Sequence, residues 1–257
     1  MERAPEPSRT TALVRREPER RGLLGRLRSA MEKWTLQLGG REMEERLARL
    51  VAPQNEYGVD PFGLDLEFTK AAVAPALWLY KNWFRVQTHG IERVPAGKVL
   101  LVANHSGQVV GTPENCRRLL MGGETIMVFP EGTRGLNKTF DKRYQLQDFG
   151  IGFMRLALET RTPIVPVAVI GAEEQAPALL DFKAGARALG FPALPITPTL
   201  LPLPLPVKYH LHFGEPMRFV GNPDDEDSEL ERRVREVKMQ IQTMMDRGLV
   251  ERGGLFF

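Results

Sequence analysis

The apolar and polar positions along the chain predict strands that alternate with helices. Apolar runs typical of buried strands occupy Lys98–Ala103, Glu124–Phe129 and Ile164–Ile170. Strict alternation over Val207–Phe213 indicates one more strand. Helical periodicity is found in four other stretches, which are Phe68–Phe84, Pro113–Met121, Phe149–Thr160 and the residues after Ser228. We therefore expect an α/β fold with a largely parallel sheet flanked by helices.

Three short signals predict where helices begin and end. Thr112 has the features of an N-cap, with Pro113 at the first helical position. Ser228 and Glu231 form a capping box at the start of the last helix. Gly248 is expected to end that helix.

Composition and periodicity divide the chain into four expected parts. Residues 1–22 are rich in Arg, Glu and Pro and are expected to be a disordered basic tail. Residues 23–67 are expected to form an amphipathic helical extension followed by a loop. Residues 68–221 hold the alternating strands and helices of the α/β domain, and residues 222–257 hold a C-terminal helix and tail.

The charge of the chain is mildly basic, and its excess is local. The formal net charge is +3 and the pI is near 9.1. Residues 1–30 contain eight Arg against four Glu, which suits an anionic membrane surface, nucleic acid or simply a solvated tail. Because the chain contains no recognised nucleic-acid-binding motif, we expect no nucleic-acid partner. A single cysteine, Cys116, excludes an internal disulfide and any metal site built from several cysteines.

Membrane contact is expected at the surface only. Ala71–Tyr80 is apolar but shorter than the ~20 residues that a transmembrane helix needs. Ala188–Val207 is long enough and uncharged, but its six prolines prevent a continuous helix. The first residues lack the apolar core of a secretory signal. We therefore expect a cytoplasmic protein that associates peripherally with membranes.

Two polar motifs follow the predicted strands and carry the candidate chemistry. The sequence Asn-His-Ser-Gly occupies Asn104–Gly107, and Phe-Pro-Glu-Gly-Thr-Arg-Gly occupies Phe129–Gly135. Open α/β sheets place their ligand sites at the carboxyl ends of strands. His105 has the side chain best suited to accept a proton near neutral pH. Arg134 offers a planar fork for a phosphate, in a turn whose glycines free the backbone to approach a ligand. A structural histidine and an exposed surface turn are the alternatives.

Together these motifs resemble those of the glycerophospholipid acyltransferases, the superfamily that contains lysophosphatidate acyltransferase. The first family motif is a histidine in an Asn-His context, as at His105. The third is Phe-Pro-Glu-Gly-Thr-Arg, which Phe129–Arg134 matches throughout. The fourth is an apolar strand with a proline, as in Ile164–Val167. The resemblance extends over about Phe68–Pro216.

The resemblance implies transfer of a fatty acyl group from acyl-CoA or acyl carrier protein to a hydroxyl of a lysophospholipid or related lipid alcohol. His105 would deprotonate the acceptor hydroxyl. Glu131, Gly132, Thr133 and Arg134 would form the substrate-binding turn, in which Arg134 and the backbone hold the acceptor's phosphate. The reaction requires no metal and no cofactor beyond the acyl donor.

The chain departs from the family pattern in two ways. The family places an aspartate at the fifth position after the histidine, and Val110 stands there. A second motif with a substrate-contacting arginine normally lies between the first and third motifs, yet His105 and Glu131 are only 26 positions apart. We infer that several dozen residues are missing, with the seam near Gly107–Val109. Two readings follow: an active acyltransferase, or a catalytically impaired relative that binds acyl lipid or acyl-thioester without turnover.

A further pair of side chains has the spacing of metal ligands. His210 and His212 lie on one face of the expected strand Val207–Phe213. Because no other His or Cys is nearby in the sequence, we expect no metal site here.

Overall fold

A computed structural model describes residues 66–104, 112–132, 143–175, 180–181, 195–196 and 204–254, and scattered positions between 25 and 45. The expected tail 1–22 and most of the proline-rich segment Ala188–Val207 lie outside the described residues. The chain divides into two compact units, Met1–Trp78 and Leu79–Phe257. Among the described residues, no helix combines the length and apolarity that crossing a membrane requires.

The first unit contains helix α2, Leu66–Trp78, with Pro75 inside it. The described positions between Gly25 and Leu38 are also helical. A single helix over Phe68–Phe84 was expected, but beyond Trp78 the backbone widens into a π-helical turn, η1, Leu79–Trp83.

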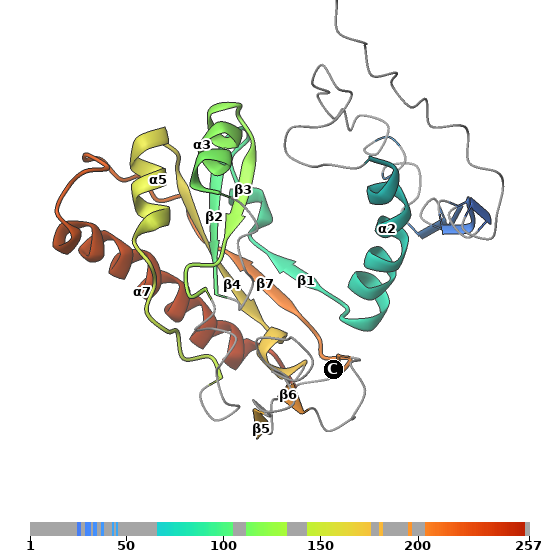
Figure 1. The fold of residues 1–257 in the computed structure, drawn as a ribbon. Helices are drawn as coiled ribbons and strands as arrows, with labels where there is room; N and C mark the ends of the chain where they lie inside the picture. Colours follow the sequence, from blue (N-terminus) through green and yellow to red (C-terminus); the bar gives the residue numbers. More distant parts are fainter. Residues whose placement is uncertain are drawn as a thin grey trace, which may run out of the picture. The chain divides into compact units, whose positions relative to one another are not determined.

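The second unit is built on a five-stranded mixed sheet with the strand order β1-β7-β4-β2-β3 (Figure 1). Its strands are β1 (Gln87–His89), β2 (Val99–Ala103), β3 (Thr125–Val128), β4 (Ile164–Ile170) and β7 (His210–Phe213). The pairs β2–β3, β2–β4 and β1–β7 are parallel, and only β4–β7 is antiparallel. The prediction of a largely parallel sheet is therefore confirmed. Two short strands, β5 (Leu180–Asp181) and β6 (Pro195–Ile196), form a separate antiparallel pair.

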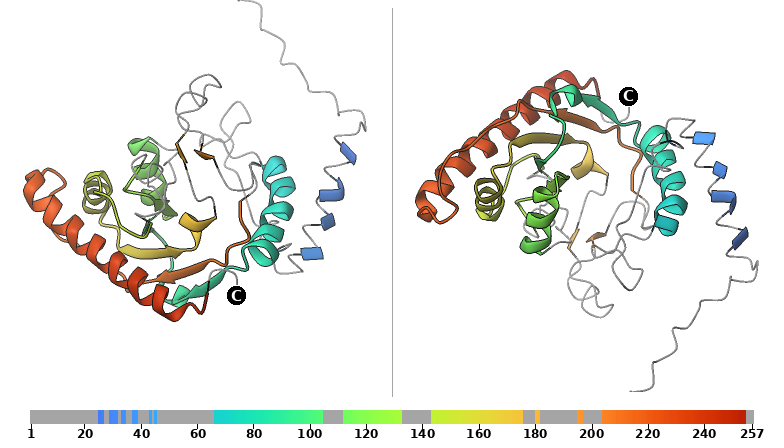
Figure 2. Two further views of the ribbon diagram at one scale, coloured as in Figure 1. Left: turned by 90° about the horizontal axis from the view of Figure 1, so that it is seen from below. Right: turned by 90° about the horizontal axis from the view of Figure 1, so that it is seen from above.

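Five described helical elements complete this unit besides η1. They are the helices α3 (Pro113–Met121), α5 (Gly152–Thr160) and α7 (Asp227–Glu251) and the short 3-10 turns η2 (Ile91–Arg93) and η4 (Ala172–Glu174). In Figure 2, α7 runs along the outside of the sheet with α5 beside it. Helix α3 packs against both β3 and α5.

Apolar side chains form a core on each face of the sheet. Along β2, Leu100 and Val102 join the cluster that α5 and α7 cover, whereas Val99 and Ala103 join a second cluster on the opposite face. All seven residues of β4 are buried. A strand in the middle of such a sheet needs apolar side chains on both faces, and this explains the unbroken apolar runs of β2 and β4.

The element boundaries differ from expectation at several points. Helix α5 begins at Gly152 instead of Phe149, because the chain before it donates N–H groups to the neighbouring loop. Helix α7 begins after Glu226, so the capping box at Ser228 is wrong, and it continues through Gly248. Two strands also differ: β3 is a largely exposed edge strand, and β7 is shorter than the run Val207–Phe213.

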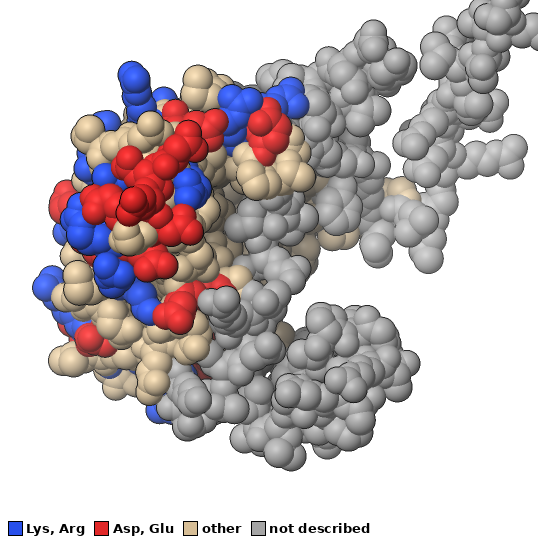
Figure 3. Space-filling model, turned by 60° about the vertical axis from the view of Figure 1, so that its left-hand side comes forward, with Lys and Arg blue, Asp and Glu red and all other residues tan. Residues whose placement is uncertain are grey.

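The outer surface of α7 carries interleaved charges of both signs. Arg232 pairs with Glu229 at 2.6 Å and with Glu236 at 2.8 Å, and Arg235 pairs with Glu231 at 3.8 Å. Figure 3 shows Lys and Arg intermixed with Asp and Glu over the face it presents. This face therefore lacks the single-sign field that attracts a nucleic-acid backbone.

Candidate active site

Strands β2 and β3 bring the two predicted motifs to one edge of the sheet. The strands are parallel neighbours, and Val102 lies opposite Val128 in their register. Asn104 follows the end of β2 and Phe129 follows the end of β3. Because adjacent strands are about 4.8 Å apart, the two motifs leave the sheet side by side.

The first motif begins with a buried asparagine that is fully engaged with the next strand. Asn104 is 1% exposed. Its Nδ2 donates to the carbonyl oxygen of Val169 at 2.9 Å, and its Oδ1 accepts from the Val169 N–H at 2.6 Å. The side chain thus continues the ladder between β2 and β4. It fixes the point at which the chain leaves the sheet toward His105.

The third motif begins as a tight turn around a buried carboxylate. The Gly132 N–H donates to the Phe129 carbonyl oxygen at 3.1 Å, and Gly132 adopts a φ of 56°, a left-handed conformation that glycine adopts without strain. Glu131 is 3% exposed, and its Oε2 accepts from the Gln147 N–H at 2.9 Å. A second bond, from the Gly150 N–H to the Pro130 carbonyl oxygen, ties the turn to the segment before α5.

Three of the predicted site residues are not placed. His105, Thr133 and Arg134 lie outside the described residues, while Glu131 and Gly132 lie within them. The structure therefore establishes where the chain leaves toward each of the three, and their roles stay predictions.

An apolar cavity of about 290 Å³ adjoins this turn. A second cavity, of about 390 Å³ and with a partly polar lining, lies elsewhere in the unit. The smaller cavity is lined by Pro113, Cys116, Val128, Phe129, Pro130, Gly150, Gly152, Phe153 and Leu156. Its volume is near the lower end of the range for small-molecule sites. Burial raises the pKa of the Cys116 thiol, so this cysteine is poorly suited to act as a nucleophile.

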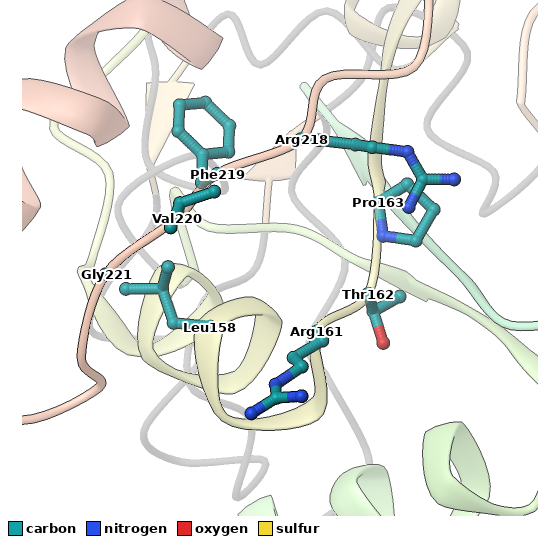
Figure 4. Close-up of a pocket in the computed structure, with 8 residues that line it drawn as sticks. All are labelled: Leu158, Arg161, Thr162, Pro163, Arg218, Phe219, Val220 and Gly221. Atoms are coloured by element: carbon teal, nitrogen blue, oxygen red, sulfur yellow. The ribbon is translucent and has the colours of Figure 1, made fainter.

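The larger cavity lies at the opposite end of the sheet, just before β4. It is lined by Leu158, Arg161, Thr162, Pro163, Arg218, Phe219, Val220 and Gly221. Figure 4 shows the guanidinium groups of Arg161 and Arg218 pointing in different directions. Ligand sites of α/β sheets lie at the carboxyl ends of the strands, so we place the candidate site at the other end.

A buried ion pair anchors the end of α7 near the carboxyl end of β4, and no pattern in the sequence predicted it. Arg252 donates two hydrogen bonds to Glu174, both at 2.6 Å. Glu174 is 4% exposed. The Tyr144 hydroxyl accepts from the Gly171 N–H at 2.9 Å and from Arg252 at 3.3 Å. Burial, reinforced by the Glu174 carboxylate, raises the pKa of Tyr144, so its phenol stays protonated.

Comparisons with known proteins identify the family. A family model described as acyltransferase matches residues 106–170. An uncharacterized protein of Mycobacterium tuberculosis is 37% identical, in an alignment that covers 79% of this chain and 72% of that protein. A 1-acyl-sn-glycerol-3-phosphate acyltransferase of Cocos nucifera is 32% identical over 29% of this chain and 25% of its own length. The chain belongs to the glycerophospholipid acyltransferase superfamily.

One solved structure is also similar. It is the crystal structure of the 1-acyl-sn-glycerophosphate acyltransferase PlsC from Thermotoga maritima, with a TM-score of 0.47 and 16% sequence identity. The match covers 88% of this chain and 98% of that one.

The alignment with the mycobacterial protein shows that this chain is shorter internally. It spans 263 positions, more than the 257 residues of the whole chain, although only 79% of the chain, about 203 residues, takes part. About 60 of the 263 positions therefore hold a residue of the relative and none of this chain. The family match begins one residue after His105, close to the predicted seam.

Proposed function

We propose that this protein transfers a fatty acyl group from acyl-CoA or acyl carrier protein to a hydroxyl of a lysophospholipid or related lipid alcohol at a membrane surface. One observation carries the proposal: the Asn104 end of β2 and the buried turn at Glu131 leave adjacent parallel strands beside an apolar cavity. The proposal assigns a proton acceptor, an anion-binding turn and a place for an acyl chain to this edge of the sheet.

In the proposed reaction His105 accepts the proton of the acceptor hydroxyl. The resulting oxygen nucleophile attacks the thioester carbonyl, and the tetrahedral intermediate expels the donor's thiolate. The proton on His105 then passes to the thiolate, which leaves as the thiol. Arg134 and the backbone N–H groups of Gly132 and Thr133 hold the acceptor's phosphate. Every step is completed without a covalent enzyme intermediate.

Glu131 is proposed to shape the pocket. Its carboxylate is almost fully buried, and one oxygen is engaged by the Gln147 N–H. A carboxylate held in this way fixes the turn from which Thr133 and Arg134 continue. The alternative role, accepting a hydrogen bond from the substrate hydroxyl, requires an exposed oxygen and is less well supported by this burial.

The cavity beside Phe129 and Pro130 is proposed to receive the acyl chain. Its lining is almost entirely hydrocarbon, and it adjoins the turn that carries Glu131. Burying an alkyl chain there contributes roughly 0.8 kcal/mol of binding free energy per methylene group. This arrangement would place the thioester near the end of β2.

Peripheral contact with a membrane is part of the proposal. Leu79 is 37% exposed and Tyr80 is 41% exposed, next to each other in η1. In the other unit Trp34 is 39% exposed, within a stretch rich in basic residues. Exposed aromatic and aliphatic side chains with neighbouring basic residues suit a lipid–water interface.

The second candidate is a catalytically impaired relative that binds acyl lipid or acyl-thioester without turnover. Two observations favour it. Val110 stands where the family has the aspartate that orients the histidine, and about 60 aligned positions of the mycobacterial relative are missing. Loss of the orienting aspartate in serine proteases lowers kcat by about four orders of magnitude.

Measuring turnover and binding in parallel separates the two candidates. The full chain is incubated with acyl-CoA and lysophosphatidate, and phosphatidate is quantified by mass spectrometry. Binding of a non-transferable acyl-CoA thioether is measured by calorimetry on the same preparation. An acyltransferase forms phosphatidate and binds the analogue. Binding without phosphatidate supports the impaired relative, and neither binding nor product contradicts both candidates.

A further inference from the structure

Three of the four histidines of the chain lie together at the β1–β7 pair. The parallel register places His89 of β1 opposite His212 of β7, and Gln87 opposite His210. His210 and His212 are two positions apart and therefore share a face of β7. One ring nitrogen from each of the three histidines lies within 4.8 Å of those of the other two. The sequence indicated only the pair on β7, because β1 is a three-residue exposed strand without alternation.

One pair of these histidines already has the nitrogen–nitrogen separation that a metal ion requires. His89 Nε2 and His210 Nδ1 are 3.4 Å apart. Two nitrogens bound tetrahedrally to Zn²⁺ at about 2.0–2.1 Å are themselves about 3.4 Å apart. The rings of His89 and His212 are stacked with their centroids 4.5 Å apart. His89 is exposed on an edge strand, whereas His210 is buried.

The described protein groups leave a buried ring nitrogen of this cluster without a hydrogen bond. His210 is 8% exposed. The Nε2 atom of His212 is buried without a hydrogen-bond partner in the part of the chain that is described. Buried polar atoms normally have partners. Gly248 of α7 leaves room for this cluster, since a Cβ there would lie 2.7 Å from His212 Nε2.

The electrostatic surroundings favour neutral imidazole, the form that binds metals. Burial is the main cause that lowers the pKa of both His210 and His212. Lys208 and Arg252 lower the pKa of His210 further, whereas Glu251 acts on His212 in the opposite direction.

We propose that His89, His210 and His212 bind a divalent transition-metal ion, for which Zn²⁺ is the best match. Three imidazoles with an open fourth position for water are a common zinc ligand set. The ion would link the short edge strand β1 to β7, whose His212 packs against Gly248 of α7. Strand β4 separates β7 from β2, and none of the three histidines takes part in the proposed acyl transfer.

Metal titration of the full-length, tag-free protein tests this proposal. The protein is freed of metal with a chelator, and Zn²⁺ binding is measured by calorimetry and by competition with a chromophoric chelator. Co²⁺ in place of Zn²⁺ reports the ligand geometry through its visible absorption. The variants are His89→Gln and His212→Gln, and His105→Gln is the matched control because it changes the fourth histidine. Circular dichroism in chelator checks that each variant folds.

We expect one Zn²⁺ per chain, an intense Co²⁺ spectrum typical of tetrahedral coordination, and a higher Tm with Zn²⁺. Losing a group that hydrogen-bonds to a zinc ligand and orients it costs about 10- to 100-fold in affinity, so losing a ligand itself should weaken binding by at least about tenfold. His105→Gln should bind as the unaltered chain does. Absence of binding to the unaltered chain overturns the proposal, as does binding by folded His89→Gln with unchanged affinity. Because His89 is exposed, that variant stays informative even if His212→Gln does not fold.

Discussion

The side-chain amide of Asn104 makes both of its hydrogen bonds to the backbone of Val169. Its Nδ2 lies 2.9 Å from the Val169 carbonyl oxygen, and its Oδ1 lies 2.6 Å from the Val169 nitrogen. The amide thus replaces one further residue of strand β2 in the ladder with β4. The asparagine of the Asn-His motif therefore has a structural role, because it holds the chain in place where it turns toward His105.

Replacing Asn104 with alanine should destabilise the protein. Both backbone groups of Val169 would lose their partners in a buried place, and each unsatisfied group costs about 1–3 kcal/mol. We expect Asn104→Ala to lower the free energy of unfolding by about 2–4 kcal/mol in urea titrations. Asn222→Ala is the control, because Asn222 is exposed, and it should change stability by less than about 1 kcal/mol. Equal effects of the two substitutions would contradict the role given to Asn104.

Two arginines of the C-terminal region provide a matched test of buried and exposed ion pairs. Arg252 and Glu174 have side chains 12% and 3% exposed, whereas Arg232 and Glu229 are 55% and 41% exposed. Both pairs are 2.6 Å apart. Arg252→Ala leaves a buried carboxylate and should cost about 3–5 kcal/mol of unfolding free energy. Arg232→Ala should cost at most about 1 kcal/mol. A small effect of Arg252→Ala in urea unfolding would show that the nearby Arg143 compensates.

The reactivity of Cys116 should report the apolar cavity. Burial raises the pKa of its thiol, so the reactive thiolate is scarcer at pH 8 than for a free cysteine, whose pKa is about 8.5. A thiol reagent should react at least about tenfold more slowly with the native chain than with the urea-unfolded chain. A long-chain acyl-CoA thioether should slow the native reaction further. Native labelling as fast as unfolded labelling would argue against the burial of Cys116 in this apolar cavity.

Much of the fold can be predicted from the sequence where local signals and burial agree. Strand β4 has its expected limits because seven consecutive apolar residues fit only a strand buried on both faces. Helix α3 begins where the N-cap signal placed it, and the Thr112 hydroxyl accepts from the Asn115 N–H at 3.3 Å. The sequence also predicts that both motifs lie at the same edge of the sheet, because each follows a strand and the two strands are parallel.

Contacts between distant segments could not be predicted. His89 meets His210, which is 121 positions away in the sequence, and His212 through the pairing of β1 with β7, and no local pattern marks β1 as a strand. Gly248 was expected to end α7, but its missing side chain is needed where the helix packs on Ile170 and His212. Local sequence also gave no indication that Glu174 and Arg252 meet, because their approach depends on how α7 docks on the sheet.

Introducing the family's carboxylate should increase turnover if its absence limits catalysis. Val110→Asp restores an acidic group at the fifth position after His105, where it would orient the imidazole and stabilise its charged form. We expect kcat for thiol release to rise by at least about tenfold, because orienting carboxylates are worth up to about four orders of magnitude. Val109→Asp is the control. A gain no greater than that of the control would contradict the role assigned to this position.

The most direct measurement of the central claim is thiol release from acyl-CoA in the presence and absence of lysophosphatidate. It compares the unaltered chain with His105→Ala, and Arg232→Ala serves as an exposed-surface control. The account predicts release that depends on lysophosphatidate, is abolished in His105→Ala and is retained in Arg232→Ala. Release at background in the unaltered chain, or acceptor-dependent release that survives in His105→Ala, would contradict it.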